Sequence, residues 1–293
     1  MIDNITCRLY HDGIEEWNSN APIVLNGLSY YPYFKNNQVA FYKADIKNIQ
    51  VIIYQNAIIL RNSLHKFYHG NNYCDFNCTE LICTVDALCD ITGFNWWEAD
   101  ITRMEYGMNV LISAENDVIQ SLMLFKSKEF LAMISKAKKY GKVCEQTNYK
   151  LKCYDKTLQY KLVEKQTIPN NIIRCEIVVT KMAYLSKRKL PIEINCLKNL
   201  KKPEVLQLLL EDLISKFKDC AYSNNYNLEG LTANEKKIYA IMTNPELSII
   251  LKCNNPHTYR RDRKTFRKII SKGRNVTNEF FMELEVQKNK LLK

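Results

Sequence analysis

The sequence contains no run of apolar residues that approaches the ~18 residues of a membrane-spanning helix, so no transmembrane segment is predicted. Its first residues, MIDNITCRLYHDG, include an early Asp and no basic segment leading into an apolar one, so we expect no secretory signal peptide. We find no internal repeat and no low-complexity segment. The 11 cysteines form no Cys-x-x-Cys pair, and this pattern favours reduced thiols in a (bacterial) cytoplasm.

A zinc site is poorly supported by the cysteine spacing. The tightest group of potential ligands comprises Cys74, Cys78, Cys83 and Cys89, shortly after His65 and His69. Their spacings match no zinc-ribbon or zinc-finger pattern. A spacing near four residues instead predicts a helix that packs small apolar thiols inward.

The charge of the chain favours a polyanionic partner. The 42 Lys and Arg residues exceed the 31 Asp and Glu residues, which gives a formal net charge of +11. Nucleic acid is the first candidate and an acidic membrane surface the second. Because Lys, Asn, Ile and Tyr all have AT-rich codons, the placement of the charges is more informative than their number.

The first half of the chain shows both strand and helix patterns. Residues 1–64 are rich in β-branched and aromatic residues, and the following stretch SLHKFYHGNNYCDF (63–76) predicts a loop. Further along, we expect a helix over 79–93, a strand over 98–113, a long helix over 116–141 closed by Gly141, and strands near 148–156 and 171–180.

Beyond about residue 190 the pattern becomes helical. Segments with helical periodicity cover residues 202–220, 232–242, 245–252, 258–273 and 278–293. We therefore predict an α+β fold, with a largely antiparallel sheet and flanking helices, followed by a helical C-terminal part. The expected division is one domain over 1–190 and a helical basic region over 191–293.

Three predicted strands each present a polar face opposite an apolar face. The polar faces carry Arg103, Glu105 and Asn109 in the first strand, Lys150, Lys152, Tyr154 and Lys156 in the second, and Arg174 and Glu176 in the third. A solvent-exposed face with cross-strand ion pairs would explain the polar residues of any one strand. It explains less well why all three strands carry charged residues on one face.

These residue types suit chemistry on a phosphodiester. Two carboxylates can hold a divalent cation, and Arg and Lys can hold phosphate oxygens. A tyrosine has a pKa of ~10, and nearby cations are expected to favour its phenolate, a nucleophile for phosphorus.

Four stretches together resemble the rolling-circle replication initiators of the filamentous-phage gene II type, which are related to the initiators of small rolling-circle plasmids. They are SLHKFYHGNN (63–72), TRMEYGMN (102–109), YKLKCYDKTLQ (149–159) and IIRCEIVV (172–179). Each stretch is short and matches the family pattern only approximately. The order and spacing of all four together are fairly specific for the family.

The resemblance implies an enzyme that nicks and rejoins one DNA strand at an origin. Its tyrosine attacks a phosphodiester, stays linked to the 5′ phosphate and frees a 3′ hydroxyl that primes synthesis. Tyr154 matches the tyrosine of the Y-x-K motif, with Lys152 and Lys156 beside it. The implied partners are origin DNA, supercoiled or single-stranded, and the helicase and polymerase of the host.

The resemblance also implies a divalent metal, Mg²⁺ or Mn²⁺. Glu105 and Glu176 match the acids of two Arg-x-acid motifs, whose basic residues Arg103 and Arg174 are expected to contact phosphate. The family pattern usually has Asp in place of Glu105 and a second Asp in place of Asn109.

Because of these departures, the metal site is expected to be leaner than usual or completed from elsewhere, for example by His65 or His69. Gln159 is a third departure, at a position where the family often has Glu. No His-hydrophobe-His motif is present, so the larger histidine-based class of nickases is not matched.

A second candidate contact with DNA lies near the C-terminus. Between Lys252 and Arg274 there are nine Lys or Arg residues and a single acid, Asp262. A solvated basic helix gives the same pattern, but interleaved aromatic residues favour phosphate contacts by Arg260, Arg261, Arg263 and Arg267.

The sequence leaves two other possibilities open. The adjacent Trp96 and Trp97 could stack on single-stranded bases, although two neighbouring residues cannot share one face and at least one is expected in the core. The alternative function is a non-catalytic DNA-binding regulator derived from such an initiator. A membrane-surface binder would need a basic helix with a larger apolar face.

Overall fold

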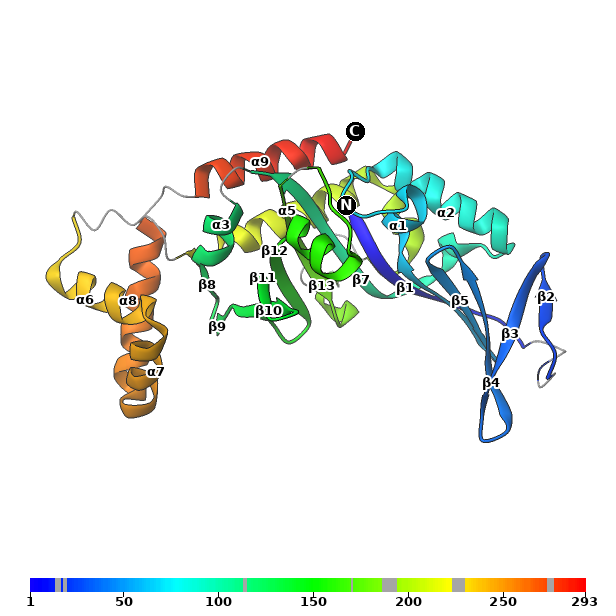
Figure 1. The fold of residues 1–293 in the computed structure, drawn as a ribbon, viewed down its shortest axis with the longest axis horizontal. Coiled ribbons are helices and arrows are strands. Elements are labelled where there is room, and N and C mark those ends of the chain that lie inside the picture. The colour runs from blue at the N-terminus through cyan, green and yellow to red at the C-terminus, as the bar shows by residue number, and fades with distance from the viewer. Residues whose placement is uncertain are drawn as a thin grey trace.

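The computed structural model describes residues 1–13, 17, 20–112, 115–169, 171–185, 194–222, 230–272 and 277–293. Within them, an eleven-stranded sheet has the order β10-β11-β12-β13-β7-β1-β6-β5-β4-β3-β2, and a small sheet has the order β14-β8-β9. The strand pairs of both sheets are antiparallel. The predicted α+β fold is confirmed (Figure 1).

The strands of the main sheet are β1 (Ile2–Tyr10), β2 (Ile23–Leu25), β3 (Leu28–Lys35), β4 (Gln38–Ile46), β5 (Ile49–Tyr54), β6 (Ala57–Ser63), β7 (Asp100–Leu111), β10 (Leu131–Ser135), β11 (Lys138–Glu145), β12 (Tyr149–Asp155) and β13 (Ile172–Val179). The small sheet consists of β8 (Leu122–Phe125), β9 (Lys128–Glu129) and β14 (Cys220–Tyr222). The helices are α1 (Leu64–His69), α2 (Cys78–Thr92), α3 (Glu115–Ser121), α4 (Lys156–Gln159), α5 (Pro203–Lys218), α6 (Ala233–Thr243), α7 (Pro245–Asn254), α8 (Pro256–Lys272) and α9 (Thr277–Leu291).

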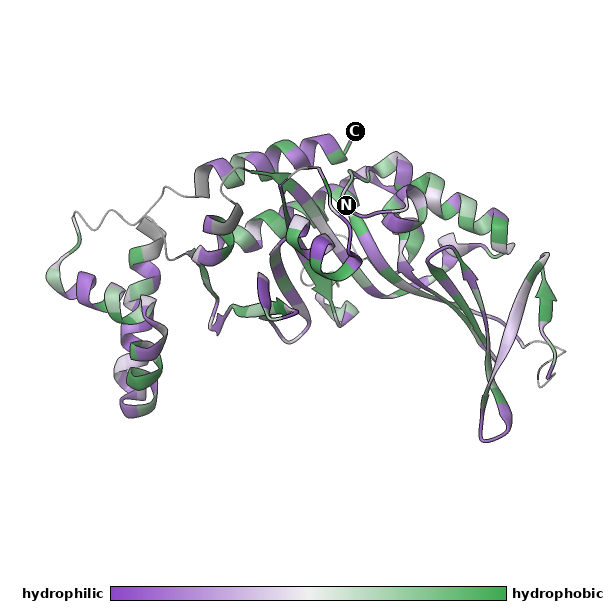
Figure 2. Ribbon diagram, in the orientation of Figure 1, coloured by the Kyte–Doolittle hydropathy of each residue, from purple (hydrophilic) through white to green (hydrophobic). Residues whose placement is uncertain are grey.

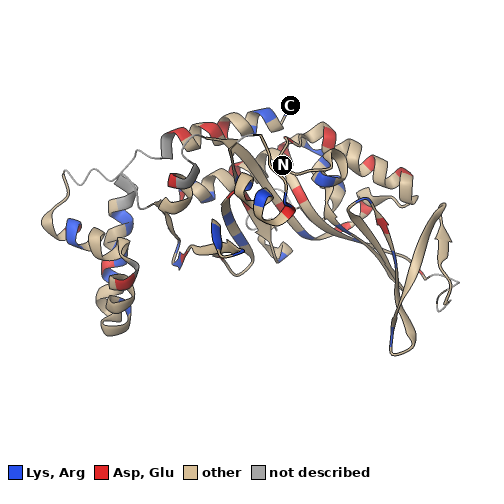
Figure 3. Cartoon of the chain, in the orientation of Figure 1, with Lys and Arg blue, Asp and Glu red and all other residues tan. Residues whose placement is uncertain are grey.

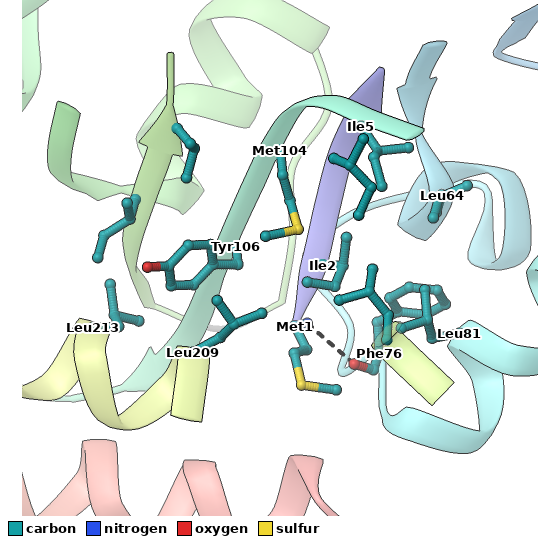
Figure 4. Packing of buried hydrophobic residues seen from close by; sticks show 14 of the residues in the cluster. Met1, Ile2, Ile5, Leu64, Phe76, Leu81, Met104, Tyr106, Leu209 and Leu213 are labelled. Carbon is teal, nitrogen blue, oxygen red and sulfur yellow. Dashed lines mark hydrogen bonds between the residues drawn. The ribbon is translucent and has the colours of Figure 1, made fainter. Parts of the chain in front are cut away.

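The main core lies between one face of the sheet and helices α1, α2, α5 and α9. Figure 4 shows apolar side chains of β1 and β7 packed against α5 on one side and against Phe76 and Leu81 on the other. Burial of each such side chain contributes about 1.5–3 kcal/mol. Figure 2 shows hydrophilic and hydrophobic bands alternating along α2 and α9, as expected for amphipathic helices that cover a core.

Helix α5 is also held to the sheet by a buried polar contact. Asp212 of α5 accepts hydrogen bonds from the hydroxyl of Tyr106 in β7, at 2.8 Å, and from the hydroxyl of Tyr184. Lys216, one turn further along α5, pairs with the same carboxylate at 2.6 Å. Thus the first helix of the predicted C-terminal region packs directly on the predicted N-terminal domain.

Helices α6, α7 and α8 form a separate cluster at one end of the molecule (Figure 1). Their core contains Phe266 and Tyr259 of α8, and it reaches the small sheet through Leu124 and Ala221. The predicted boundary at residue 190 lies outside the described residues, and the two-domain division remains a prediction. Among the described residues, no helix is both long and apolar enough to cross a membrane.

Five helices of the C-terminal part, α5 to α9, agree with the predicted segments. The region 63–76 was wrongly predicted to be entirely loop, because Ser63 caps a short helix, α1, which ends at Gly70 in the left-handed conformation. Helix α2 begins with a capping box between Asn77 and Glu80, and its first residue, Cys78, is one position before the expected start.

The long helix predicted over 116–141 is also wrong. Only α3 is helical there, and the chain then forms β8, β9, β10 and β11. Lys126, Lys136 and Ala137 have positive φ and make the turns between these strands. Strand pairing thus overrides the helix propensity of the Leu, Met, Lys and Ala residues in this segment.

Candidate active site

The three polar strand faces lie side by side in the sheet. β12 pairs with β13, so that Tyr154 is opposite Arg174 and Lys152 is opposite Glu176. β13 in turn pairs with β7, and Asn109 is opposite Arg174. Directly paired residues point to the same face of an antiparallel sheet. The alternation read from the sequence therefore gives one continuous polar face, on the side of the sheet opposite the main core.

Two glycines make room on this face. Gly141 of β11 is opposite Tyr154, and an added Cβ would lie 2.2 Å from the Cβ of Tyr154. Gly107 of β7 is opposite Glu176, and its Cβ would lie 2.7 Å from the Cβ of Glu176. Gly141, predicted to end a helix, is thus a strand residue that allows the tyrosine to approach its neighbour closely.

A pocket of about 390 Å³ opens on the polar face. Its lining includes Tyr154, Lys152, Lys156, Glu176 and Glu105 from the predicted site. The other lining residues are Asp3, Asn4, Asn48, Asn62, Ser63, Lys66, Asn72, Gln159 and Glu164.

The Tyr154 hydroxyl donates a hydrogen bond of 3.2 Å to a carboxylate oxygen of Glu176. Burial and the negative charge of Glu176 raise the pKa of Tyr154 well above its usual value. The expected net lowering of this pKa by surrounding cations is therefore wrong: burial and the Glu176 carboxylate raise it more than the Arg174 charge lowers it. Removal of the phenolic proton requires a base, and Glu176 is in position to accept it.

The two lysines beside Tyr154 have different environments. Lys152 donates to Glu176 at 2.9 Å, and although burial opposes it, the Glu176 carboxylate raises the pKa of Lys152. Lys156 begins helix α4 and is 1% exposed. Among the described residues, no carboxylate lies within ion-pair distance of its ammonium group. Burial and the nearby Arg174 lower the pKa of Lys156 to about 7.

The rings of two tyrosines partly compensate for the missing carboxylate. The Lys156 nitrogen lies 4.9 Å from the ring centre of Tyr160 and 5.7 Å from that of Tyr154. Tyr160 is fixed by its hydroxyl, which donates to Asn72 at 2.9 Å. Tyr149 points to the opposite face and packs on Tyr184. Of these three tyrosines, Tyr154 alone lines the pocket.

Arg174 does not have the position predicted for a phosphate contact. Its guanidinium is 1% exposed and donates to Glu176 at 2.8 Å, to Asn109 at 2.9 Å and to Asp3 at 2.9 Å. Although burial opposes it, the Asp3 carboxylate raises the pKa of Arg174. Arg174 is therefore a buried charge that holds β1, β7 and β13 together.

The predicted metal ligands are engaged by protein groups. Glu105 pairs with Arg103 at 2.9 Å and accepts from Asn4 at 3.0 Å. The side-chain oxygen of Asn109 accepts from Arg174, and its amide donates to backbone carbonyls of residues 72–74. Within the described part of the chain, no group of three or more His, Cys, Asp or Glu residues could hold a metal ion.

The two histidines do not complete the predicted metal site. His65 is buried against the ring of Phe76, with 4.9 Å between ring centres, and burial lowers its pKa. The Nε2 atom of His69 lies 3.2 Å from Glu80. Neither histidine lines the pocket of Tyr154.

Asp3 is the main residue of the candidate site that is not predicted from the sequence. It is buried, pairs with Arg174, and accepts hydrogen bonds from Ser63 and, at 2.8 Å, from Asn72. Although burial opposes it, the Arg174 guanidinium lowers the pKa of Asp3. The sequence does contain one indication of this role, which is an acidic residue within an otherwise apolar, β-branched strand. Residues 70–72, the end of the first of the four resembling stretches, have a structural role here, because Asn72 forms hydrogen bonds with Asp3, Tyr160 and Asn109 of β7.

The other candidate contacts with DNA are the arginines of α8 and the two neighbouring tryptophans. In α8, Arg260, Arg261 and Arg267 are exposed and Arg263 is half-buried. Arg261 pairs with Asp262 at 3.1 Å, whereas Arg263 and Arg267 donate to the backbone carbonyls of Ser127 and Lys126. Trp96 and Trp97 both lie in the core, with their indole nitrogens bonded to Thr92 and Asp86. The tryptophans therefore offer no surface for stacking on bases.

Comparisons with known proteins give distant similarity to solved structures. No family model matches the sequence, and no curated protein matches it. A solved structure described as a rolling circle replication initiator protein from Geobacillus stearothermophilus aligns with 83% of this chain and 96% of its own. The identity is 11% and the TM-score is 0.41, values too low to transfer the role of any residue.

Proposed function

We propose that this protein is a replication initiator that cleaves and rejoins one strand of DNA through a covalent link between Tyr154 and a 5′ phosphate. The observation that carries the proposal is the contact of the Tyr154 hydroxyl with Glu176 in a pocket bordered by Lys152 and Lys156. A nucleophile, a base and two cations are what phosphoryl transfer to tyrosine requires.

In the proposed reaction, the Tyr154 oxygen forms a bond to phosphorus as the bond from phosphorus to the 3′ oxygen breaks. The phenol becomes more acidic as the new bond forms, and its proton passes to Glu176. The 3′ oxygen leaves with the bonding electron pair and takes a proton from water. A phosphotyrosine diester keeps the energy of the original bond, so the strand can be rejoined without ATP.

The lysines act on the charge of the phosphate. Its non-bridging oxygens remain negative throughout the transfer, and cations near them stabilise the transition state. Lys156 suits this role because it lacks a carboxylate partner among the described residues and its ammonium charge is poorly compensated. The freed 3′ hydroxyl would then be extended by the polymerase of the host, with a host helicase opening the duplex.

A divalent cation fits the present arrangement of Glu105 and Glu176 poorly. Both carboxylates are already neutralised, by Arg103 in one case and by Lys152 and Arg174 in the other. Binding of Mg²⁺ or Mn²⁺ there would require one of these cations to move away. The metal requirement remains a prediction, and cleavage that is undiminished in EDTA would reject it.

The proposal is tested with purified protein and supercoiled DNA that carries its own origin. Wild type should give a covalent protein–DNA adduct on a denaturing gel, and peptide mapping should place it on Tyr154. Tyr154→Phe removes one oxygen, so the adduct should vanish while the fold and DNA binding persist. An adduct that persists in this variant would contradict the assignment.

A second candidate function is a non-catalytic DNA-binding regulator. It is favoured by the full pairing of Glu105, Glu176 and Arg174 within the protein, as in a face built for stability. Tight binding to origin DNA with no adduct in wild type would select this function over the first.

A further inference from the structure

An aromatic surface lies on the same sheet, several strands away from Tyr154. We define it by the side chains of Tyr10, Tyr31, Tyr33, Phe41 and Tyr54, from β1, β3, β4 and β5. Pairing of β3 with β4 puts Tyr33 opposite Phe41, and Ala57 of β6 is opposite both Tyr54 and Tyr10. The five rings therefore share one face of the sheet.

These rings are unusually accessible. Tyr10 is 69% exposed, Tyr31 59%, Tyr33 47% and Tyr54 37%. Their neighbours on the other face, such as Tyr30 and Tyr42, are fully buried in the core. Aromatic rings of this size usually supply the apolar area that drives folding. Their concentration on one open face points to a ligand with flat apolar groups.

The rings already form a short ladder. Tyr33 and Phe41 are stacked, with 4.9 Å between ring centres and 15° between planes, and Tyr54 lies 5.6 Å from Phe41. Arg8 lies 6.0 Å from the ring of Tyr10, and Lys43 lies 6.0 Å from that of Tyr33. Aromatic rings interleaved with cations are the combination that holds the bases and phosphates of single-stranded nucleic acid.

The charge near the ladder is mainly positive. Arg61 is exposed on β6 and lies on the same face as Gln50 and Thr6. Asp45, which pairs with Lys43 at 2.9 Å, is the acid of this face in β4. Figure 3 shows few acidic residues on β3 and β4.

The face is continuous with the pocket of Tyr154. Hydrogen bonding of Asn4 to Glu105 and pairing of Thr6 with Arg103 put the outward residues of β1 on the polar face of β7. The pocket itself crosses the sheet from Tyr154 in β12 to Asn62 in β6. The strand after β6 in the sheet is β5, which is five strands away from β12. With ~4.8 Å between neighbouring strands, β5 lies about 24 Å from β12. Uncharged amides line this part of the pocket, which suits a path for a polar chain.

We propose that the aromatic surface binds the single-stranded DNA that adjoins the phosphodiester held at Tyr154. This inference rests on the proposed function for the identity of the strand, whereas the binding of single-stranded DNA can be measured without cleavage. Base stacking on Tyr33, Phe41 and Tyr54 would tolerate any sequence. Arg8 and Arg61 would contact the backbone between the rings and the pocket.

The test measures binding of a labelled oligo-dT of about 16 nucleotides, the upper end of what one such surface holds. All proteins carry Tyr154→Phe, so that no strand is cut. Tyr33→Ala together with Tyr54→Ala should weaken binding by about 30-fold or more, since each stacked ring contributes about 1–3 kcal/mol. Tyr33→Phe with Tyr54→Phe keeps the rings and should bind as tightly as the parent.

Tyr68→Ala is the matched control. Tyr68 is 44% exposed but lies on α1, outside the aromatic surface. Its loss should change the affinity less than two-fold. Circular dichroism of each variant confirms the fold.

The failure of this inference differs from failure of the proposed function. Unchanged oligo-dT binding by the double Ala variant overturns the inference even if wild type forms an adduct at Tyr154. A change of oligomeric state in that variant, seen by size-exclusion chromatography with DNA affinity unchanged, would make the surface an interface between copies and also overturns it. If the double Ala variant loses oligo-dT binding and the wild type forms no adduct, the result supports the aromatic surface and rejects only the proposed enzymatic function.

Discussion

The environment of Lys156 leads to a quantitative prediction. Its pKa falls from the ordinary value of 10.5 to about 7, because burial and the Arg174 charge disfavour the ammonium form. A lowered lysine pKa means that the folded protein binds this proton more weakly than the unfolded chain. The cost to stability is fully present below pH 7 and disappears as the pH rises from 7 towards 10.5.

The size of the cost follows from the shift. Each pKa unit corresponds to about 1.4 kcal/mol, so the cost is at most about 5 kcal/mol at pH 6 and about 2 kcal/mol at pH 9. Lys156→Met keeps a long apolar chain and removes the charge, but it also removes the cation–π attraction to Tyr160 and Tyr154, which contributes about 1–2 kcal/mol. We expect the variant to be more stable than wild type by roughly 3 kcal/mol at pH 6.

The assay is urea unfolding followed by circular dichroism at pH 6 and pH 9. The gain in stability should be larger at pH 6 and should fall to at most about 2 kcal/mol at pH 9, where Lys156 is already neutral in the folded protein and has no cation–π attraction to lose. The matched control is Lys152→Met, on the same face of the sheet. Because Lys152 pairs with the buried Glu176, its loss should destabilise the protein by roughly 1–3 kcal/mol.

A Lys156→Met variant that is less stable than wild type at both pH values would refute this reasoning. It would show that the ammonium is satisfied by solvent in the pocket and is not a buried charge. A more stable variant that no longer forms the Tyr154 adduct would indicate that Lys156 is retained for function at the expense of stability.

Two further perturbations probe the sheet and the basic helix. Gly141→Val forces a side chain against Tyr154, and we expect a loss of about 1–3 kcal/mol in urea unfolding together with loss of the adduct; a variant with unchanged stability and activity would show that β11 moves freely. Arg260→Ala with Arg261→Ala should flatten the salt dependence of DNA binding by about one unit for each phosphate that is no longer neutralised. Arg263→Ala with Arg267→Ala should instead lower the melting temperature, since these side chains bond the turn between β8 and β9; equal salt slopes for the two pairs would contradict this division.

The alternation of polar and apolar residues was enough to predict the site face. It identified β7, β12 and β13 and the side to which Glu105, Tyr154 and Glu176 point. The amphipathic helices of the C-terminal part were predictable for the same reason, because a period of 3.6 residues persists over several turns. The segment 116–141 was not, because short strands joined by left-handed turns are specified by their pairing partners and not by their own composition.

The partner of Arg174 could not be predicted from local pattern. Asp3 is 171 positions away in the sequence and belongs to none of the four motifs. Without it, the polar face appeared to have a surplus of cations waiting for phosphate. With it, Arg174 is a neutralised structural residue, and Lys156 is the cation on this face that lacks a carboxylate partner among the described residues. One long-range ion pair, between Asp3 and Arg174, thus neutralises Arg174, and Lys156, beside Tyr154, is the cation that we propose for the phosphate.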